Sequence, residues 1–171
     1  MPKATLPQPR RAAIALGANL GDRHATLERA ISLIAQNVGP IERRSAWLET
    51  PALIHPDDPA TTYPDFLNGV VLVRSCHGAT ALLAELHWIE RSLGRNRETE
   101  TTRWRPRLID LDLIALEEET IDQRELTVPH PEMHHRDFVL APLCEVWPDW
   151  RHPLLGRTAA ELLAELRRDQ R

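Results

Sequence analysis

The chain has 171 residues, of which 42% are hydrophobic and 27% are charged, and its formal net charge at pH 7 is −4. This length and composition are typical of a compact globular protein, and the negative charge gives no overall attraction to nucleic acid or to acidic membranes. No apolar run approaches the roughly 20 residues of a membrane span, and two cysteines are too few for a disulfide framework or a zinc site, so a cytoplasmic location is expected.

The pattern of apolar residues predicts alternating strands and helices. Residues 1–11 lack an apolar core segment, so we expect a disordered lead-in to a single domain over residues 12–171. Apolar alternation predicts strands, and apolar residues three or four positions apart predict helices. The predicted order is a strand at 12–18, a turn at 19–23, a helix at 26–37, a strand at 41–50, a loop at 51–64, a strand at 66–74, a helix at 80–93, a loop at 95–106, a strand at 108–116, a short irregular return at 121–128, a segment rich in proline and histidine at 129–157 and a helix at 158–168.

Several strands with few helices between them favour an α+β sandwich over a doubly wound parallel sheet. The strand at 108–116 carries the most informative pattern, because Asp110 and Asp112 lie two positions apart and therefore project to the same face. Two like charges on a buried strand repel each other, so a cation is expected beside them, and Mg²⁺ prefers carboxylate oxygens. The alternative is that one aspartate is a surface residue on an edge strand.

Five arginines precede this strand closely, and arginine pairs with phosphate oxygens in a planar, bidentate manner. They are Arg95, Arg97, Arg103, Arg105 and Arg107. Together with the aspartates they indicate a site for metal and polyphosphate, although a run of charges is more often a solvated face. A GxxxxGKS sequence is absent, which excludes a Walker-type phosphate cradle.

A second group of residues suggests a flat ligand. Asn68 interrupts an apolar strand, FLNGVV, where a buried amide without a partner would cost about 1–3 kcal/mol. Either a ligand supplies its hydrogen bonds or the asparagine is satisfied within the core. Phe66 and Phe138 are the only phenylalanines; core packing is the simpler explanation for them, but aromatic faces also suit a heterocycle.

Four blocks of this sequence match the motifs of one known protein family, and they occur in the same order as in that family. They are IALGANLGDR, DFLNGVVLV, RWRPRLIDLDLI and LTVPHPEMHHRDFVLAPL, between about residues 12 and 150. In these blocks the chain resembles the 6-hydroxymethyl-7,8-dihydropterin pyrophosphokinases of folate biosynthesis. It departs from them at Arg105, where a small residue is usual, in a slightly longer segment from Gly94 to Trp104, and at Pro131, where some members carry an aromatic residue.

The resemblance implies a ferredoxin-like α-β-α sandwich with a mainly antiparallel central sheet. It implies transfer of the pyrophosphoryl group of ATP to the hydroxymethyl group of the pterin, with release of AMP. Two Mg²⁺ ions and ATP as co-substrate are implied, and a segment at 94–106 is expected to open for ATP and close for chemistry. Small-molecule substrates are the expected partners, with no nucleic acid and no membrane, and a monomer is expected.

The resemblance also assigns site residues. The residues implied in catalysis are Arg95, Arg107, Asp110 and Asp112, and the two aspartates are the implied metal ligands. Residues implied in ATP binding are Glu90, Arg95, Arg97, Trp104, Arg107, Thr127, His130 and Arg136. Residues implied in pterin binding are Thr50, Pro51, Leu53, Phe66, Asn68 and Phe138.

Two other classes of function were weighed. A catalytically idle nucleotide- or metal-binding relative is disfavoured because the aspartates, the arginines and Asn68 are all intact. A nucleic-acid binder that uses the arginine segment is disfavoured by the negative net charge and by the scarcity of aromatic residues among the arginines.

Overall fold

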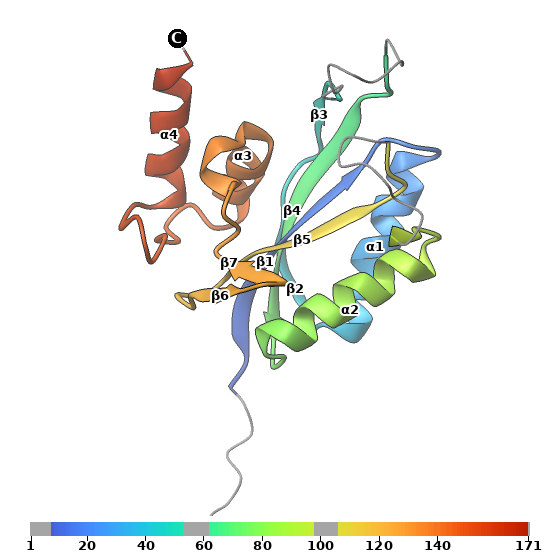
Figure 1. The fold of residues 1–171 in the computed structure, drawn as a ribbon, viewed down its shortest axis with the longest axis horizontal. Helices are drawn as coiled ribbons and strands as arrows, with labels where there is room; N and C mark the ends of the chain where they lie inside the picture. The colour runs from blue at the N-terminus through green and yellow to red at the C-terminus, as the bar shows by residue number, and fades with distance from the viewer. Residues whose placement is uncertain (1–7, 53–61, 98–105, 171) are drawn as a thin grey trace, which may run out of the picture.

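The protein is described by a computed structural model over residues 8–52, 62–97 and 106–170. A central antiparallel sheet has the order β2-β4-β1-β5, with β3 paired to the remaining length of β4 (Figure 1). The strands of this sheet are β1 (Arg10–Ala18), β2 (Ile41–Arg44), β3 (Leu48–Thr50), β4 (Phe66–Ser75) and β5 (Asp110–Leu116). A separate hairpin is formed by β6 (Ile121–Gln123) and β7 (Leu126–Val128).

Helices cover both faces of the sheet, so the molecule has three layers. Figure 1 shows α1 (Arg23–Asn37) and α2 (Ala79–Ser92) on one side, and α3 (Asp137–Val146) and α4 (Ala159–Asp169) on the other. A 3₁₀ turn, η2 (Met133–His135), precedes α3. The predicted α+β sandwich of the ferredoxin-like type, with an antiparallel sheet, is confirmed.

Alternation along the strands divides the apolar side chains between two cores. From β1, Ile14 and Leu16 pack with α1 and α2, whereas Ala13 packs with α3. From β5, Leu111 and Leu113 enter the first core. The aspartates that alternate with these leucines therefore project toward the α3 side of the sheet.

Helix boundaries follow their capping residues closely. The carboxylate of Asp22 accepts a hydrogen bond from the N–H of Ala25, so α1 begins three residues before the predicted start. Helix α2 ends beside Gly94, whose φ of +98° suits glycine. Helix α4 begins with a capping box formed by Thr158 and Glu161.

Two predictions along the chain were wrong. The strand predicted at 41–50 is interrupted, because the Ser45 hydroxyl accepts from the N–H of Val70 and donates to the carbonyl of Ala46 in place of regular pairing. Helix α3 was not predicted, because it is short and contains Pro142, and apolar residues on several of its faces hide the helical period.

The ends of the domain and two internal predictions fall partly outside the described ranges. The predicted lead-in at 1–11 is undescribed up to residue 7, whereas Arg10 and Arg11 already belong to β1. Residues 53–61 and 98–105 are also outside, and with them much of the predicted loops at 51–64 and 95–106. The single-domain organisation stays a prediction. None of the helices within the described ranges combines the length and apolar character of a membrane span.

Candidate active site

Alternate side chains of β5 open into a cavity of about 490 Å³ on the α3 side of the sheet. Asp110 and Asp112 both line it, as their spacing predicted. Strand β5 is an edge strand, as the alternative interpretation supposed, but both aspartates still face the cavity. The other predicted residues that line it are Thr50, Pro51, Phe66, Asn68, Arg107, Arg136 and Phe138.

Asp110 is held between two guanidinium groups. Arg95 Nη1 donates to Asp110 Oδ1 at 2.6 Å, and Arg107 Nη1 donates to Oδ2 at 2.7 Å. Burial pushes the pKa of Asp110 upward, but Arg107 and Arg95 outweigh burial and keep the pKa below its usual value. Asp110 therefore stays ionised, with both of its oxygens already accepting hydrogen bonds.

Asp112 is in a different electrostatic environment from Asp110. Burial, the charge of Asp110 and the charge of Glu90 raise the pKa of Asp112 to about 7, and the opposing effects of Arg97 and Arg136 are smaller. No ion pair holds its carboxylate within the described residues. A cation bound beside Asp112 would stabilise the ionised form of this carboxylate.

Mg²⁺ fits this pair of carboxylates. It is usually bound through one or two carboxylates, and substrate phosphates and water complete its coordination. Over the ranges that the structure describes, no cluster of three or more histidine, cysteine, aspartate or glutamate side chains could hold a metal. Substrate phosphates and water would supply the other oxygen ligands of a metal bound to Asp110 and Asp112.

The environment of Asp112 predicts a pH-dependent stability. A free aspartate has a pKa of about 3.9, so ionising Asp112 costs the folded state nothing below that pH. The cost increases as the pH rises toward 7 and is complete above it. In EDTA at pH 8 we expect Asp112→Asn to increase Tm by at least about 2 °C, the shift that about 1 kcal/mol produces in a domain of this size.

Thermal melts at pH 4 and pH 8 provide the control for this prediction. At pH 4 both proteins carry a largely neutral side chain at position 112, so their Tm values should converge. An equal difference at the two pH values would contradict the assigned environment of Asp112.

Glu90 lies beneath the aspartates and is completely buried. Its carboxylate accepts from Arg95 Nη1 at 2.7 Å and from Arg97 Nε at 2.7 Å. It also accepts at 2.8 Å from the backbone N–H of Leu111, which lies between the two aspartates on the edge strand. Glu90 thus supports the backbone of the aspartate pair directly and supports Asp110 through Arg95.

The arginines predicted to bind phosphate occupy two kinds of position. The side chain of Arg95 is only 3% exposed and also donates to the carbonyl of Ile109. Arg107 lines the cavity with a side chain that is 23% exposed. Arg97 is 41% exposed, but here it binds Glu90. Trp104, like Arg103 and Arg105, lies outside the described residues.

A buried amide and two aromatic rings form the other part of the cavity lining. Asn68 is 7% exposed, and its Nδ2 donates to Thr50 Oγ1 at 2.8 Å. Phe66 from β4 and Phe138 from α3 both line the cavity, and the Arg136 guanidinium lies 5.9 Å from the centre of the Phe138 ring. Leu53 lies outside the described residues. The remaining lining therefore presents flat apolar surfaces around one amide.

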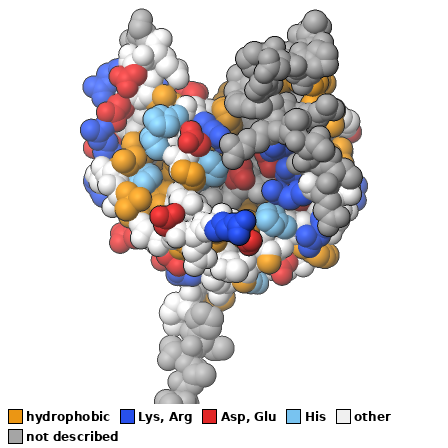
Figure 2. Space-filling view, viewed as in Figure 1, with side chains coloured by type: hydrophobic (Ala, Val, Ile, Leu, Met, Phe, Trp, Pro, Cys, Tyr) orange, Lys and Arg blue, Asp and Glu red, His pale blue; other side chains and the backbone are white. Residues whose placement is uncertain are grey.

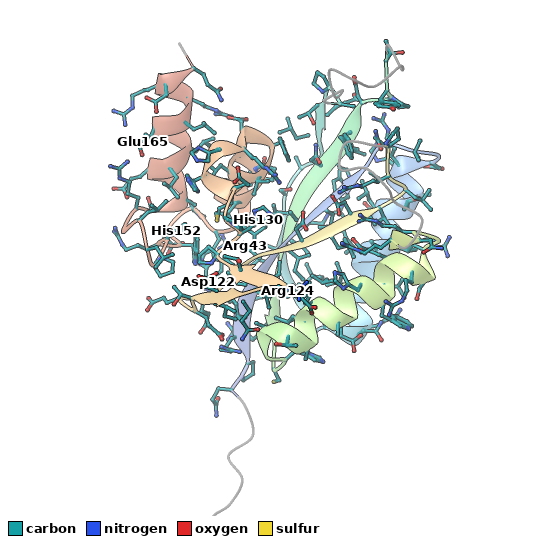
Figure 3. All side chains as sticks on the ribbon, in the orientation of Figure 1. Arg43, Asp122, Arg124, His130, His152 and Glu165 are labelled. Carbon is teal, nitrogen blue, oxygen red and sulfur yellow. The ribbon has the colours of Figure 1, made fainter. Side chains whose placement is uncertain are left out.

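Two further predicted ATP-site residues, like Glu90, Arg95 and Arg97, are not part of the cavity lining. Thr127 is on β7, and His130 follows that strand (Figure 3). The N–H of His130 donates to the carbonyl of Ile114 at 2.9 Å, and its Nδ1 accepts from the N–H of Glu132. Burial, followed by Arg136, lowers the pKa of His130 and so favours the neutral imidazole.

Several lining residues were not predicted. They are Ala15, Leu16, Gly17, Gly69, Ile114, Glu132, His135 and Val139. Most are apolar or small residues whose types carry no chemical signal. Gly17 was accessible from the sequence only as part of the turn-like GANLG segment, because its role depends on its pairing with Asn68 across β1 and β4.

The charge on the described surface is mixed. Figure 2 shows acidic and basic side chains interspersed on the face toward the viewer, with no continuous basic area among the coloured residues. Nucleic-acid binding normally requires such a basic surface.

The chain is similar in sequence to one family of known proteins. The sequence model of the family described as 7,8-dihydro-6-hydroxymethylpterin-pyrophosphokinase matches residues 13–148. The 2-amino-4-hydroxy-6-hydroxymethyldihydropteridine pyrophosphokinase of Synechocystis sp. is 38% identical over 156 residues, which are 91% of this chain and 75% of that protein. The Bacillus subtilis protein of the same name is 39% identical over 134 residues, 78% of this chain and 75% of its own.

Solved structures show the same fold. A crystal structure of Plasmodium falciparum HPPK-DHPS matches with a TM-score of 0.71 at 15% sequence identity and covers 95% of this chain. The match covers 45% of that longer chain, so the present chain spans less than half the length of that solved protein.

Proposed function

The chain belongs to the 7,8-dihydro-6-hydroxymethylpterin-pyrophosphokinase family, and we propose that the cavity over Asp110 and Asp112 is its active site. The protein is a pyrophosphokinase of folate biosynthesis, which transfers the pyrophosphoryl group of ATP to the hydroxymethyl group of 6-hydroxymethyl-7,8-dihydropterin and releases AMP. The observation that carries the location is one cavity lined by an aspartate pair, by the arginine that holds Asp110, by a buried asparagine and by two phenylalanines.

In this site the hydroxymethyl oxygen forms a bond to the β-phosphorus of ATP. The bond from the β-phosphorus to the oxygen shared with the α-phosphate breaks, and AMP leaves with that oxygen. The hydroxyl proton passes to water as the new bond forms. No covalent intermediate with the protein is needed, since such a transfer depends on positioning and on stabilising charge.

On the phosphate side, Arg107 is the residue we propose for stabilising the negative charge that shifts toward AMP. It lines the cavity next to Asp110, which orients its guanidinium. Arg136 lines the same cavity and adds positive charge there. The proposed contribution of Arg95 is to hold Asp110, since its side chain is almost completely buried.

The other ATP contacts stay predictions with different degrees of structural support. Glu90 is buried, so we propose that it contributes through Arg95 and Arg97. Arg97 is exposed enough to reach phosphate if it leaves Glu90. For Thr127 and His130 the proposal rests on the resemblance of the VPHP segment, as it does for Trp104.

Asp110 and Asp112 are the proposed ligands of two Mg²⁺ ions. When bound, these ions would neutralise charge on the phosphate oxygens and polarise the β-phosphorus. The fit rests on Asp112, a half-buried carboxylate in the cavity lining whose pKa is raised by desolvation and by the negative charges of Asp110 and Glu90. The dependence on magnesium and the number of ions are both part of this proposal.

On the pterin side, Asn68 and Thr50 offer donors and acceptors for the edge of the ring. Their mutual hydrogen bond holds the Asn68 amide in one orientation. Phe66 and Phe138 offer aromatic faces. Pro51 adds apolar lining, and Leu53 is assigned to the same pocket by resemblance alone.

We further propose a monomer in a reducing cytoplasm. Both cysteines are free, with Cys76 exposed and Cys144 partly buried, which suits a reducing compartment. Size-exclusion chromatography with light scattering would test the oligomeric state.

The proposed function is tested by measuring AMP release from ATP with and without the hydroxymethyl pterin, in the presence of Mg²⁺ or of EDTA. AMP should form only when both the pterin and Mg²⁺ are present. Release of AMP without pterin, or none with it, would contradict the proposed reaction, and full activity in EDTA would contradict the metal assignment.

Gly17→Ala is expected to weaken pterin binding. A Cβ at this position would lie 2.9 Å from Asn68 Oδ1, which is closer than real contacts allow, so the Asn68 amide must leave the position in which it donates to Thr50. We expect the KM for pterin to increase by about tenfold, the effect of about 1.4 kcal/mol, with little change in the KM for ATP.

Gly78→Ala is a matched control for this change. A Cβ at Gly78 meets no atom within 4 Å, and its φ of −72° suits alanine. Steady-state kinetics of both variants, with the KM for pterin and for ATP measured separately, test this prediction. An unchanged KM for pterin in Gly17→Ala would refute the role assigned to Asn68.

A further inference from the structure

Asn19 is a buried polar residue to which the proposed mechanism assigns no task. It directly follows β1 and is 1% exposed. Buried amides are almost always hydrogen-bonded, so the partners of Asn19 identify what it holds in place.

The first partner is the backbone of Arg107, which Asn19 contacts twice. The backbone N–H of Asn19 donates to the Arg107 carbonyl at 3.1 Å, and the Arg107 N–H donates to Asn19 Oδ1 at 2.7 Å. Both peptide groups of Arg107 are therefore fixed. This fixes the origin of a side chain that reaches Asp110 Oδ2 at 2.7 Å.

The second partner lies on the pterin side of the cavity. Asn19 Nδ2 donates to the carbonyl of Pro64 at 3.1 Å. Pro64 lies two residues before the start of β4, whose first residue, Phe66, lines the cavity together with Asn68. One amide thus joins the segment that enters β5 to the segment that enters β4.

We propose that Asn19 is a positioning residue that sets Arg107 and the beginning of the pterin-binding strand at a fixed separation. Both functions of the amide are required, because its oxygen accepts from Arg107 while its nitrogen donates to Pro64. An aspartate of the same shape would keep the acceptor and lose the donor. This inference rests on the proposed function.

The two links can be separated with two variants. Asn19→Asp should keep kcat within a few-fold of the unaltered protein and increase the KM for pterin several-fold, since only the link to Pro64 is lost. Asn19→Leu loses both links, so kcat should fall by about 10- to 100-fold, as expected when a catalytic group is misplaced by about 1 Å.

Asn37→Asp is the matched control, because Asn37 also donates from Nδ2 to a backbone carbonyl, that of Leu33 in α1. Tm, kcat and both KM values would be measured for all three variants. A purely structural role would lower Tm in both Asn19 variants but leave kcat and KM per folded molecule unchanged, and that result would overturn the inference. If Asn19→Leu does not fold, an unchanged KM for pterin in Asn19→Asp overturns it.

The unaltered protein, measured in the same assay, separates the two possible failures. If it forms no AMP with pterin, the proposed function fails, and this inference fails with it. If it is active and both Asn19 variants match it, this inference alone is overturned.

Discussion

Asp112→Ala is expected to reduce kcat by on the order of 10³-fold or more while the Kd for the pterin changes little. A metal acting on a phosphoryl group supplies several kcal/mol of charge stabilisation, and each 1.36 kcal/mol is a factor of ten in rate. Asp112 is the carboxylate whose charge is not balanced by an arginine, so it depends most on the cation. The pterin surfaces of Asn68 and Phe138 come from β4 and α3 and should persist.

Turnover of Asp112→Ala should be measured beside Asp149→Ala, which changes an exposed aspartate outside the cavity lining. Pterin binding is followed by a direct titration without ATP. Near-normal activity in Asp112→Ala would show that the metal ligands lie elsewhere. Loss of pterin binding together with turnover would indicate that Asp112 supports the cavity as a whole.

Arg107→Ala is expected to reduce kcat and Arg95→Ala to reduce stability, although the sequence assigns both arginines to phosphate binding. Arg107 lines the cavity, so its loss should reduce kcat by about 10³- to 10⁵-fold, the effect of an arginine on related phosphoryl transfers, with little change in stability. Arg95 is buried against Glu90 and Asp110, so its removal takes one guanidinium partner from each carboxylate and leaves Glu90 with Arg97 and Asp110 with Arg107. That loss should lower the free energy of unfolding by about 3 kcal/mol, since a hydrogen bond to a charged group contributes about 1.5–3 kcal/mol.

Chemical denaturation and steady-state kinetics on the two variants distinguish these outcomes. Arg44→Ala serves as the control, because Arg44 forms an exposed ion pair with Glu28, and such pairs contribute about 0–1 kcal/mol. Equal stability of Arg95→Ala and the unaltered protein would refute the structural role of Arg95. Normal kcat in Arg107→Ala would show that Arg107 is not a catalytic residue.

The pair Asp110 and Asp112 was predictable because a strand has a period of two, which is a local property of the backbone. Their different electrostatic states were not predictable, since these depend on burial and on Arg95 and Glu90, which the packing of other segments brings beside them. The role of Asn19 was hidden for the same reason. Its partners, Arg107 and Pro64, are 88 and 45 residues away along the chain.

Helix α3 is an element that the local sequence pattern did not reveal. It is short, contains Pro142 and is apolar on several faces, so its period is obscured until the sheet supplies a surface on which Val139, Leu140 and Leu143 are buried. Phe138 reaches the cavity because that packing places α3 over β4.

The sequence by itself determined the α+β class, the apolar alternation of the strands and the motifs that identify the family, because each depends on residues close together in the chain. Only the tertiary structure decided which arginine lines the cavity, which carboxylate lacks an arginine partner in the described part of the chain and which asparagine contacts the segments that enter β4 and β5. Those properties depend on burial and charge from distant segments, and the dielectric environment of a side chain exists only once these segments have packed.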